Sequence, residues 1–166
     1  MSYLIFTDQK SFMEYFEQGA SPQTVALYRK LVAEEDEELG QGLASYDAAP
    51  TPDAVTEVAD AIMDGIYVRI GLLHALGLDP QSLWDEVQRS NIAKLKHRCE
   101  RCDGSKMITI NDEDGHECPG CEGAGFVYRV KRRDDGKVLK PEGWEPPNLY
   151  PLVVAMLSRR TLGSEA

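Results

Sequence analysis

The stretch LVAEEDEELG, residues 31–40, places five acidic side chains in a row within a helical pattern. Each residue of an α-helix advances by about 100° around the axis, so Glu34, Glu35 and Glu38 share one face while the other two acids point elsewhere. The next helical pattern carries a second acidic set on one side, spaced i, i+3 and i+7, which consists of Glu57, Asp60 and Asp64. Antiparallel packing of these two helices would bring the two acidic sets face to face.

Two interpretations of this acidity differ in what balances the charge. A solvated surface helix normally carries Lys or Arg at i+4 from its acids, but no basic residue occurs between Lys30 and Arg69. Carboxylate oxygens without nitrogen or sulfur ligands suit hard divalent cations such as Mg²⁺ or Mn²⁺. The pattern therefore favours a metal site over a solvated face. Its candidate ligands are Glu34, Glu35, Glu38, Glu57, Asp60 and Asp64.

Four helical patterns precede the first cysteine, and the first of them covers residues 8–17. The next three begin with a capping residue followed by proline: Ser21 with Pro22, Thr51 with Pro52, and Asp79 with Pro80. We expect these helices to end near residues 46, 77 and 97, and a further short helix to cover residues 151–159. Short connections between long amphipathic helices favour antiparallel neighbours, so the sequence predicts an all-α bundle.

All four cysteines lie in the motifs CERC and CPGC, with fifteen residues between the two pairs. This spacing is typical of a tetrahedral structural zinc site, which is closed to water, and its ligands would be Cys99, Cys102, Cys118 and Cys121. Two disulfides or four free thiols are the alternatives. The segments KMITI and GFVYRV alternate like short strands around an EDG turn, which indicates a zinc-ribbon-like hairpin insertion. CDGSK and CEGAG also resemble the cysteine-rich elements of DnaJ-type chaperones, with Lys106 in place of the last glycine of the first copy.

The 166-residue chain has a formal charge of −10 that is unevenly distributed. Residues 1–97 contain seven Lys or Arg against sixteen Asp or Glu, whereas residues 98–140 contain nine of each. The acidic main body is a poor general partner for nucleic acid. The most apolar stretch is too short to span a membrane, and the N-terminus lacks the pattern of a secretory signal. We therefore expect a cytoplasmic protein, in a bacterial cytosol or in that of the host if the chain is phage-encoded.

The motifs EExxE, at residues 34–38, and ExxD, at residues 57–60, resemble those of the MazG-like group of all-α nucleoside triphosphate pyrophosphohydrolases. Further similarity lies in YVRIGLLHALGLD, VQRSNIAKL and DGKVLKPEGWEPP, the last of which is similar to the tail of bacterial and phage members. The resemblance covers nearly all of the chain except the cysteine insertion. It implies hydrolysis of an (d)NTP to the monophosphate and pyrophosphate, assisted by Mg²⁺ or Mn²⁺.

The resemblance also implies roles for single residues. The family's metal-binding aspartate falls on Asp64 when the chain is registered on YVRIG and on Asp60 when it is registered on ExxD, so both stay candidates. Glu35 or Glu38 is the candidate general base. The candidate substrate-binding residues are Asn91, Lys94, Lys137, Lys140 and Trp144. For the tryptophan, packing of the tail onto the bundle and stacking on a nucleobase are both open.

These inferences divide the chain into a catalytic helical bundle (1–97), a zinc-binding insertion (98–128) and a substrate-closing tail with a last helix (129–166). Similar proteins form dimers or tetramers, and the broad apolar face of the third helix suits a homo-oligomer. The base is not determined: dUTP or dCTP and dGTP or GTP are all compatible. One version is a phage guanine-nucleotide enzyme that feeds modified-genome synthesis.

Two other functions are left open by the residues. The cysteine motifs and the basic cluster YRVKRR, residues 128–133, suit a non-enzymatic zinc module that binds nucleic acid or protein, which the net charge and the facing carboxylates oppose. The same metal ligands would also serve a phosphohydrolase that acts on a phosphoribosyl-nucleotide.

Overall fold

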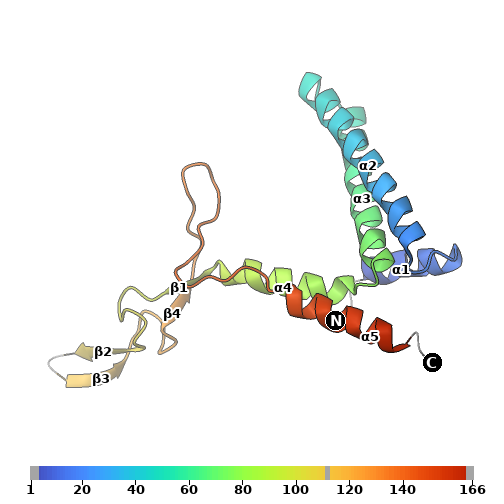
Figure 1. Ribbon diagram of the computed structural model, residues 1–166. Helices are drawn as coiled ribbons and strands as arrows, with labels where there is room; N and C mark the ends of the chain where they lie inside the picture. The colour runs from blue at the N-terminus through green and yellow to red at the C-terminus, as the bar shows by residue number, and fades with distance from the viewer. Residues whose placement is uncertain (1–3, 111–112, 164–166) are drawn as a thin grey trace. The chain divides into compact units, whose positions relative to one another are not determined.

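The computed structural model describes residues 4–110 and 113–163. Within these residues the chain is mainly helical, with four short strands between the fourth and fifth helices (Figure 1). The elements in chain order are α1 (Leu4–Tyr15), α2 (Pro22–Ala48), α3 (Pro52–Ala75), α4 (Pro80–Ala93), β1 (Lys96–Arg98), β2 (Met107–Ile110), β3 (Glu113–Glu117), β4 (Phe126–Tyr128) and α5 (Tyr150–Gly163). The predicted fold class, all-α with a small β insertion, is confirmed.

The chain divides into two compact units, and the division falls inside α4. The first unit comprises the residues up to Leu83 and those from Leu149 onward, and the second comprises Trp84–Asn148. The three functional segments expected from the sequence (1–97, 98–128 and 129–166) stay a prediction, and residues 164–166 lie outside the described part of the chain.

The long helices begin at the predicted caps. The Ser21 hydroxyl accepts a hydrogen bond from the Thr24 backbone N–H at 3.1 Å, and the Thr51 hydroxyl accepts one from Ala54 at 3.3 Å. The Asp79 carboxylate accepts two backbone N–H bonds at the start of α4. In each case the next residue is a proline, whose missing N–H is no loss in a first helical turn.

Helices α2 and α3 form an antiparallel hairpin that α1 packs against (Figure 1). The two helices approach closely at glycines: a Cβ on Gly71 would lie 2.0 Å from the Tyr28 ring, and a Cβ on Gly42 would lie 3.3 Å from the Val58 side chain. The Tyr28 hydroxyl also accepts a hydrogen bond from Gln9 at 3.1 Å and donates one to Gln18 at 2.8 Å. The core of this unit consists of Met13, Tyr28, Val68 and Ala75, flanked by Val25, Leu31, Val32 and Leu72.

No single described helix is both long and apolar enough to cross a membrane. Helices α3 and α4 have that length and composition only when taken together, across a bend of 116°.

The second unit contains two antiparallel strand pairs, and their pairing corrects the sequence prediction. Strand β1 pairs with β4, and β2 pairs with β3. The KMITI segment therefore does not pair with GFVYRV, and the EDG segment lies in strand β3 instead of forming the turn. Residues 111–112, between β2 and β3, lie outside the described residues. Bringing the two cysteine motifs together aligns β1 with β4 and leaves β2 to pair with the segment that follows it.

Helix ends differ more from expectation than helix starts. Helix α4 ends at Ala93 and not near residue 97, because the next two N–H groups bond carbonyls only three residues back. The Ser90 carbonyl instead accepts the indole N–H of Trp144 at 2.8 Å, and the chain enters β1. Helix α1 covers Leu4–Tyr15 and not 8–17; Glu17 lies beyond its end with a φ of 55°. Helix α5 extends past the predicted 151–159 at both ends.

Candidate functional site

The α2–α3 hairpin gathers the predicted acidic residues on one side. A Cβ on Gly65 of α3 would lie 3.8 Å from the Cβ of Glu35 in α2, which places the flanking α3 acids beside Glu35. Burial of the Glu35 carboxylate raises its pKa, and four nearby charges raise the pKa further: those of Glu38, Asp64, Glu34 and Asp60, in decreasing order. Five of the six candidate ligands therefore interact electrostatically.

One carboxylate oxygen of this group lacks a partner. Glu35 Oε2 is buried and has no hydrogen-bond donor in the described part of the chain. Leaving a buried carboxylate oxygen without a donor or a cation is unfavourable by an amount comparable to its lost hydration. An all-oxygen donor set with an unpartnered buried oxygen fits a hard divalent cation.

The sixth candidate, Glu57, lies with Glu38 and Asp60 around a cavity of about 360 Å³. The small residues Gly42 and Ala61 also line this cavity. The other lining residues are Gln41 and Ser45. The sequence reasoning missed these last two, although their spacing of three and seven residues from Glu38 places them on its face.

The basic residue Arg69 of α3 pairs outside the cluster. Arg69 forms an ion pair with Asp36, an acid that the helical spacing places off the shared face, and donates a hydrogen bond to the Gly65 carbonyl at 2.8 Å. Among the described residues no ion pair involves any of the six candidate ligands. The cluster therefore keeps its negative charge.

The structure brings both Asp60 and Asp64 to the acidic side of α3. Asp64 acts more strongly on the pKa of Glu35 than Asp60 does, whereas Asp60 shares the cavity with Glu38. Both stay candidates for the principal metal ligand.

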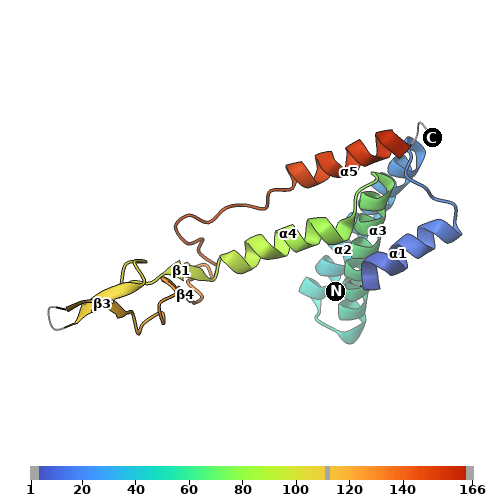
Figure 2. The ribbon, with the colours of Figure 1, turned by 90° about the horizontal axis from the view of Figure 1, so that it is seen from below.

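All five predicted substrate-binding residues lie in the second unit, where the tail runs back along α4 (Figure 2). Lys94 Nζ donates to Asn91 Oδ1 at 2.7 Å, so these two side chains lie together. The ammonium groups of Lys140 and Lys94 lie 4.0 and 5.6 Å from the ring centroid of Trp144. Two lysines, one asparagine and the Trp144 indole thus form a cationic, aromatic cluster.

Lys137 makes its contacts in a separate hairpin and not in this cluster. It sits in a hairpin closed by backbone hydrogen bonds from Leu139 to Lys131 and from Arg133 to Lys137. Its own N–H bonds the Asp135 carboxylate at 3.0 Å.

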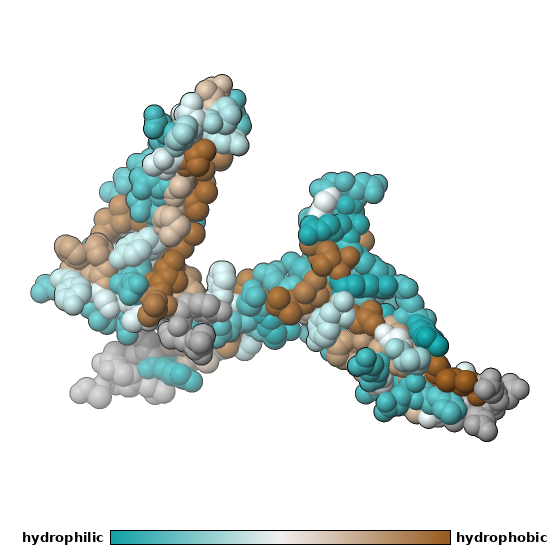
Figure 3. All heavy atoms as spheres, turned by 180° about the vertical axis from the view of Figure 1, so that it is seen from behind, coloured by the Kyte–Doolittle hydropathy of each residue, from teal (hydrophilic) through white to brown (hydrophobic). Residues whose placement is uncertain are grey.

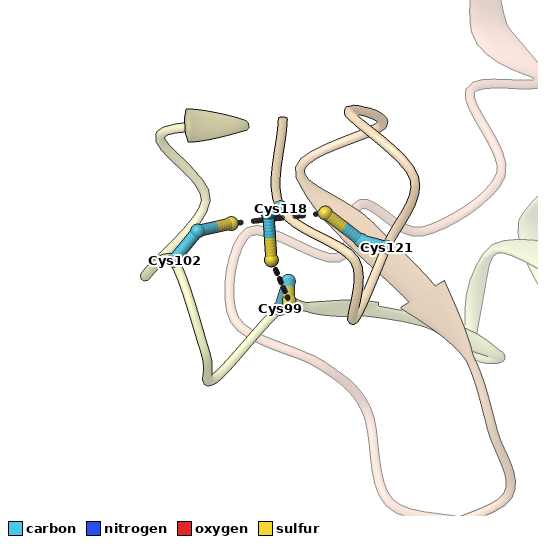
Figure 4. A group of neighbouring side chains, drawn as sticks. All are labelled: Cys99, Cys102, Cys118 and Cys121. Carbon is cyan, nitrogen blue, oxygen red and sulfur yellow. Dashed lines mark hydrogen bonds between the residues drawn. The ribbon is translucent and has the colours of Figure 1, made fainter. Parts of the chain in front are cut away.

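The four cysteines converge on one point in the second unit (Figure 4). All four sulfurs lie within 4.8 Å of one another, and the Cys99–Cys118 and Cys102–Cys121 distances are 3.8 and 3.7 Å. A tetrahedral zinc ion with Zn–S bonds of about 2.3 Å requires S–S edges of about 3.8 Å. Disulfide bonds, at about 2.05 Å, do not fit these distances. The four cysteines are thus positioned to bind one metal ion.

Both cysteine motifs fold into the same turn. The residues after Cys102 have positive φ at Asp103, Gly104 and Lys106 (49°, 76° and 73°), matched after Cys121 by 49°, 71° and 81° at Glu122, Gly123 and Gly125. The first cysteine of each turn donates its N–H to the last carbonyl of the other turn: Cys99 to Gly125 at 3.1 Å and Cys118 to Lys106 at 2.9 Å. We call these turns the two knuckles.

The thiols ionise unequally: burial raises the pKa of Cys121, whereas the pKa of Cys102 is lowered. Burial opposes ionisation of Cys102, but the Lys106 backbone N–H and the other thiols stabilise its thiolate and lower its pKa to about 7. The Gly125 N–H donates to Cys121 Sγ at 3.2 Å, the bond that a metal-bound thiolate receives in such turns.

A comparison with known protein families concerns the helices that carry the acidic candidates. The family model of phosphoribosyl-ATP pyrophosphohydrolase matches residues 10–91, a span that contains all six acidic candidates and ends before the cysteine motifs. No curated protein matches the chain. The family acts on nucleotide phosphoanhydrides, and the carboxylate cluster of α2 and α3 lies within the matched span. Residues 10–91 of this chain are thus similar to phosphoribosyl-ATP pyrophosphohydrolase, a family that belongs to the MazG-like superfamily of all-α pyrophosphohydrolases.

Proposed function

We propose that the protein is a Mg²⁺- or Mn²⁺-dependent pyrophosphohydrolase that converts an (d)NTP to the monophosphate and pyrophosphate. The observation that carries this proposal is the uncompensated carboxylate cluster around Glu35, with its buried, unpartnered Oε2. Such a cluster is costly without a cation and has the hard oxygen donors that bind one next to phosphates.

The residues take distinct parts in this reaction. Carboxylates of both helices would hold the cation, which supplies charge neutralisation for the phosphates. Glu35 or Glu38 orients a water molecule and removes its proton; a raised pKa suits Glu35 to this role because a general base works best near the operating pH. Candidate phosphate contacts are Asn91, Lys94, Lys137 and Lys140, with Trp144 offering a ring to the base.

The first experiment measures pyrophosphate release from all common NTPs and dNTPs and from phosphoribosyl-ATP, with Mg²⁺ or Mn²⁺. The wild type should release pyrophosphate from one or a few of them, with dUTP, dCTP, dGTP and GTP as the leading substrates. Glu38→Gln should abolish release, whereas Glu37→Gln, an acid off the shared face, should retain it. Activity that survives Glu38→Gln, or needs no divalent cation, would contradict the metal site.

Phosphoribosyl-ATP is included because the family match favours it as a second candidate substrate. Turnover of this compound alone would replace the (d)NTP assignment while keeping the same ligands and reaction. A chain that hydrolyses nothing would leave the non-enzymatic zinc module, whose binding to nucleic acid should then disappear when Arg132 and Arg133 are neutralised.

We also propose a homo-oligomer, a dimer or tetramer. Helix α3 exposes a row of large apolar side chains, and Figure 3 shows apolar surface along the α2–α3 pair. The row consists of side chains that are each 40 to 57 % exposed, more than a helix facing only water normally tolerates: Val55, Ile62, Met63 and Ile66.

A lysine within this row tests the interface. Ile62→Lys should reduce the molar mass measured by light scattering, whereas Leu76→Lys, beyond the end of α3, should not. Equal masses for both variants would reject the interface.

The ion bound by the cysteines is proposed to be structural zinc, because four thiolates at tetrahedral spacing leave no open position for water. Free thiols used as ligands also suit the reducing cytoplasm, where we place the protein. Elemental analysis of the purified protein should give one zinc per chain.

A further inference from the structure

A cavity of about 480 Å³ lies within the second unit, where three segments meet. Its size falls in the range of small-molecule sites, about 300–1,000 Å³. The end of α4 contributes Arg89, the two knuckles and their strands contribute Lys96, Arg98, Gly104, Gly125 and Phe126, and the tail contributes Glu142, Trp144 and Glu145. We call it the knuckle pocket.

The cations of the knuckle pocket are not equally available. Arg89 donates two hydrogen bonds to Glu86, at 2.6 and 2.7 Å, and Arg98 Nε lies 3.1 Å from the Asp103 carboxylate. Lys96 has no carboxylate partner within the described ranges; its ammonium group lies 4.0 Å from the Phe126 ring centroid. Lys96 is thus the lining cation that is free to neutralise an anion.

The remaining lining groups suit an aromatic ligand that also carries N–H groups. Trp144 has given its only donor to the Ser90 carbonyl, so it presents only its ring to the pocket, as Phe126 does. Glu142 and Glu145 are acceptors for ring or amino N–H groups. The two lining glycines lie close together, since a Cβ on Gly125 would lie 2.8 Å from the Gly104 carbonyl oxygen.

We propose that the knuckle pocket binds a nucleotide, with Lys96 contacting its phosphate and the rings of Phe126 and Trp144 contacting its base. The proposal rests on the proposed function in taking this nucleotide from the enzyme's own substrates and products. It gives the cysteine element a direct part in choosing the ligand, since two of these side chains belong to strands β1 and β4, which flank the knuckles.

The test uses the zinc-loaded protein with Trp84→Phe, so that Trp144 is the only tryptophan. Its fluorescence is titrated with dGMP, dUMP, dCMP and the matching nucleosides, none of which can be turned over. We expect saturable quenching by a monophosphate. Lys96→Gln should weaken monophosphate binding about tenfold, as expected for loss of a hydrogen bond to a charged group, and leave nucleoside binding unchanged. Phe126→Leu should weaken both.

Arg133→Gln is the matched control, since Arg133 pairs with Asp135 and does not line the pocket. An equal Kd for wild type and Lys96→Gln at equal zinc content, or no saturable quenching in a protein that hydrolyses nucleotides, overturns the proposal and leaves the proposed function intact. Lys96-dependent binding in a protein without turnover would support the nucleotide pocket and contradict the proposed enzymatic function.

Kinetics separate two sources of the bound nucleotide. A raised KM with unchanged kcat in Lys96→Gln identifies it as the substrate, and an unchanged KM with Lys96-dependent monophosphate binding identifies it as an effector. Both results support the pocket.

Discussion

Lys106 occupies a backbone position that costs free energy for any residue with a Cβ. Its φ of 73° corresponds to 81° at Gly125 in the other knuckle. A left-handed conformation costs a non-glycine residue about 1–2 kcal/mol. Lys106→Gly should therefore stabilise the zinc-loaded protein by about 1 kcal/mol, after the entropy lost by a more flexible unfolded chain is subtracted. Urea unfolding measures the change.

The matched control is Lys137→Gly, the same exchange at a position without positive φ. It should lower the unfolding midpoint or leave it unchanged. A loss of stability in Lys106→Gly would show that the lysine side chain stabilises its knuckle by more than the backbone strain.

Glu35 predicts a pH dependence of stability in the metal-free protein. Its folded-state pKa is raised above the ordinary 4.5 by burial and by the neighbouring acids, so the folded state binds the proton more tightly than the unfolded chain. The stability from this group is fully present below pH 4.5 and is lost as the pH rises through the raised pKa. Glu35→Gln should thus stabilise the metal-free protein at pH 8, with a gain that vanishes near pH 4.5.

Addition of Mg²⁺ or Mn²⁺ at pH 8 should reverse this order, because the cation stabilises only a folded state with its ligands intact. Chemical unfolding of both proteins across the pH range, with and without metal, measures the effect. Glu37→Gln should show neither the pH-dependent gain nor the reversal. A pH-independent difference for Glu35→Gln would contradict a role for repulsion in the cluster.

Between elements, α2 and α3 approach each other closely at Gly71. An added Cβ would lie 2.0 Å from the Tyr28 ring and 2.5 Å from the Gln9 amide, both in the core. Gly71→Ala should cost about 1–3 kcal/mol through overpacking. Gly40→Ala, in α2 with nothing within 4 Å of the new atom, should instead stabilise by about 0.5–1 kcal/mol. Thermal unfolding of the two variants measures both changes in stability. Changes of the same sign would contradict the close approach of the helices at Gly71.

Local chemistry made helix starts predictable and left helix ends to tertiary contacts. The caps at Ser21, Thr51 and Asp79 are formed by adjacent residues, so the sequence displays them. The end of α4 depends on Trp144, more than fifty residues away, whose indole takes the Ser90 carbonyl. The strand pairs depend likewise on cysteines that meet only in the folded chain.

The same division holds for the candidate site. Helical spacing placed the acids of each helix on one face, because that periodicity is a property of the single element. The Arg69–Asp36 pair and the Glu57–Glu38 cavity arise from the register between two helices, which no single segment encodes. The choice between Asp60 and Asp64 depends on the same register and on the cation itself.

At the scale of the whole molecule, the two units should respond differently to metal removal. The first unit has an apolar core of its own, whereas the second is organised around four buried cysteines. Binding of structural zinc supplies about 10–16 kcal/mol in small zinc domains, so its loss unfolds them. A strong zinc chelator should therefore shift the emission of Trp144, read in the Trp84→Phe protein, while circular dichroism retains the helices of the first unit.

Readdition of zinc should restore the emission. An unchanged Trp144 spectrum after verified zinc removal would show that the second unit folds without the metal. Collapse of the entire helical signal would show that the first unit cannot stay folded without the second.

The reciprocal bonding of the knuckles gives the insertion an internal twofold relation. Each half, Cys99–Lys106 and Cys118–Gly125, supplies two corners of the tetrahedron and receives its closing hydrogen bond from the other. Neither half is complete alone, as in a symmetric dimer whose monomers have been joined into one chain. Assembly of the element must then be all or none, and a peptide holding a single knuckle should form pairs around one metal ion.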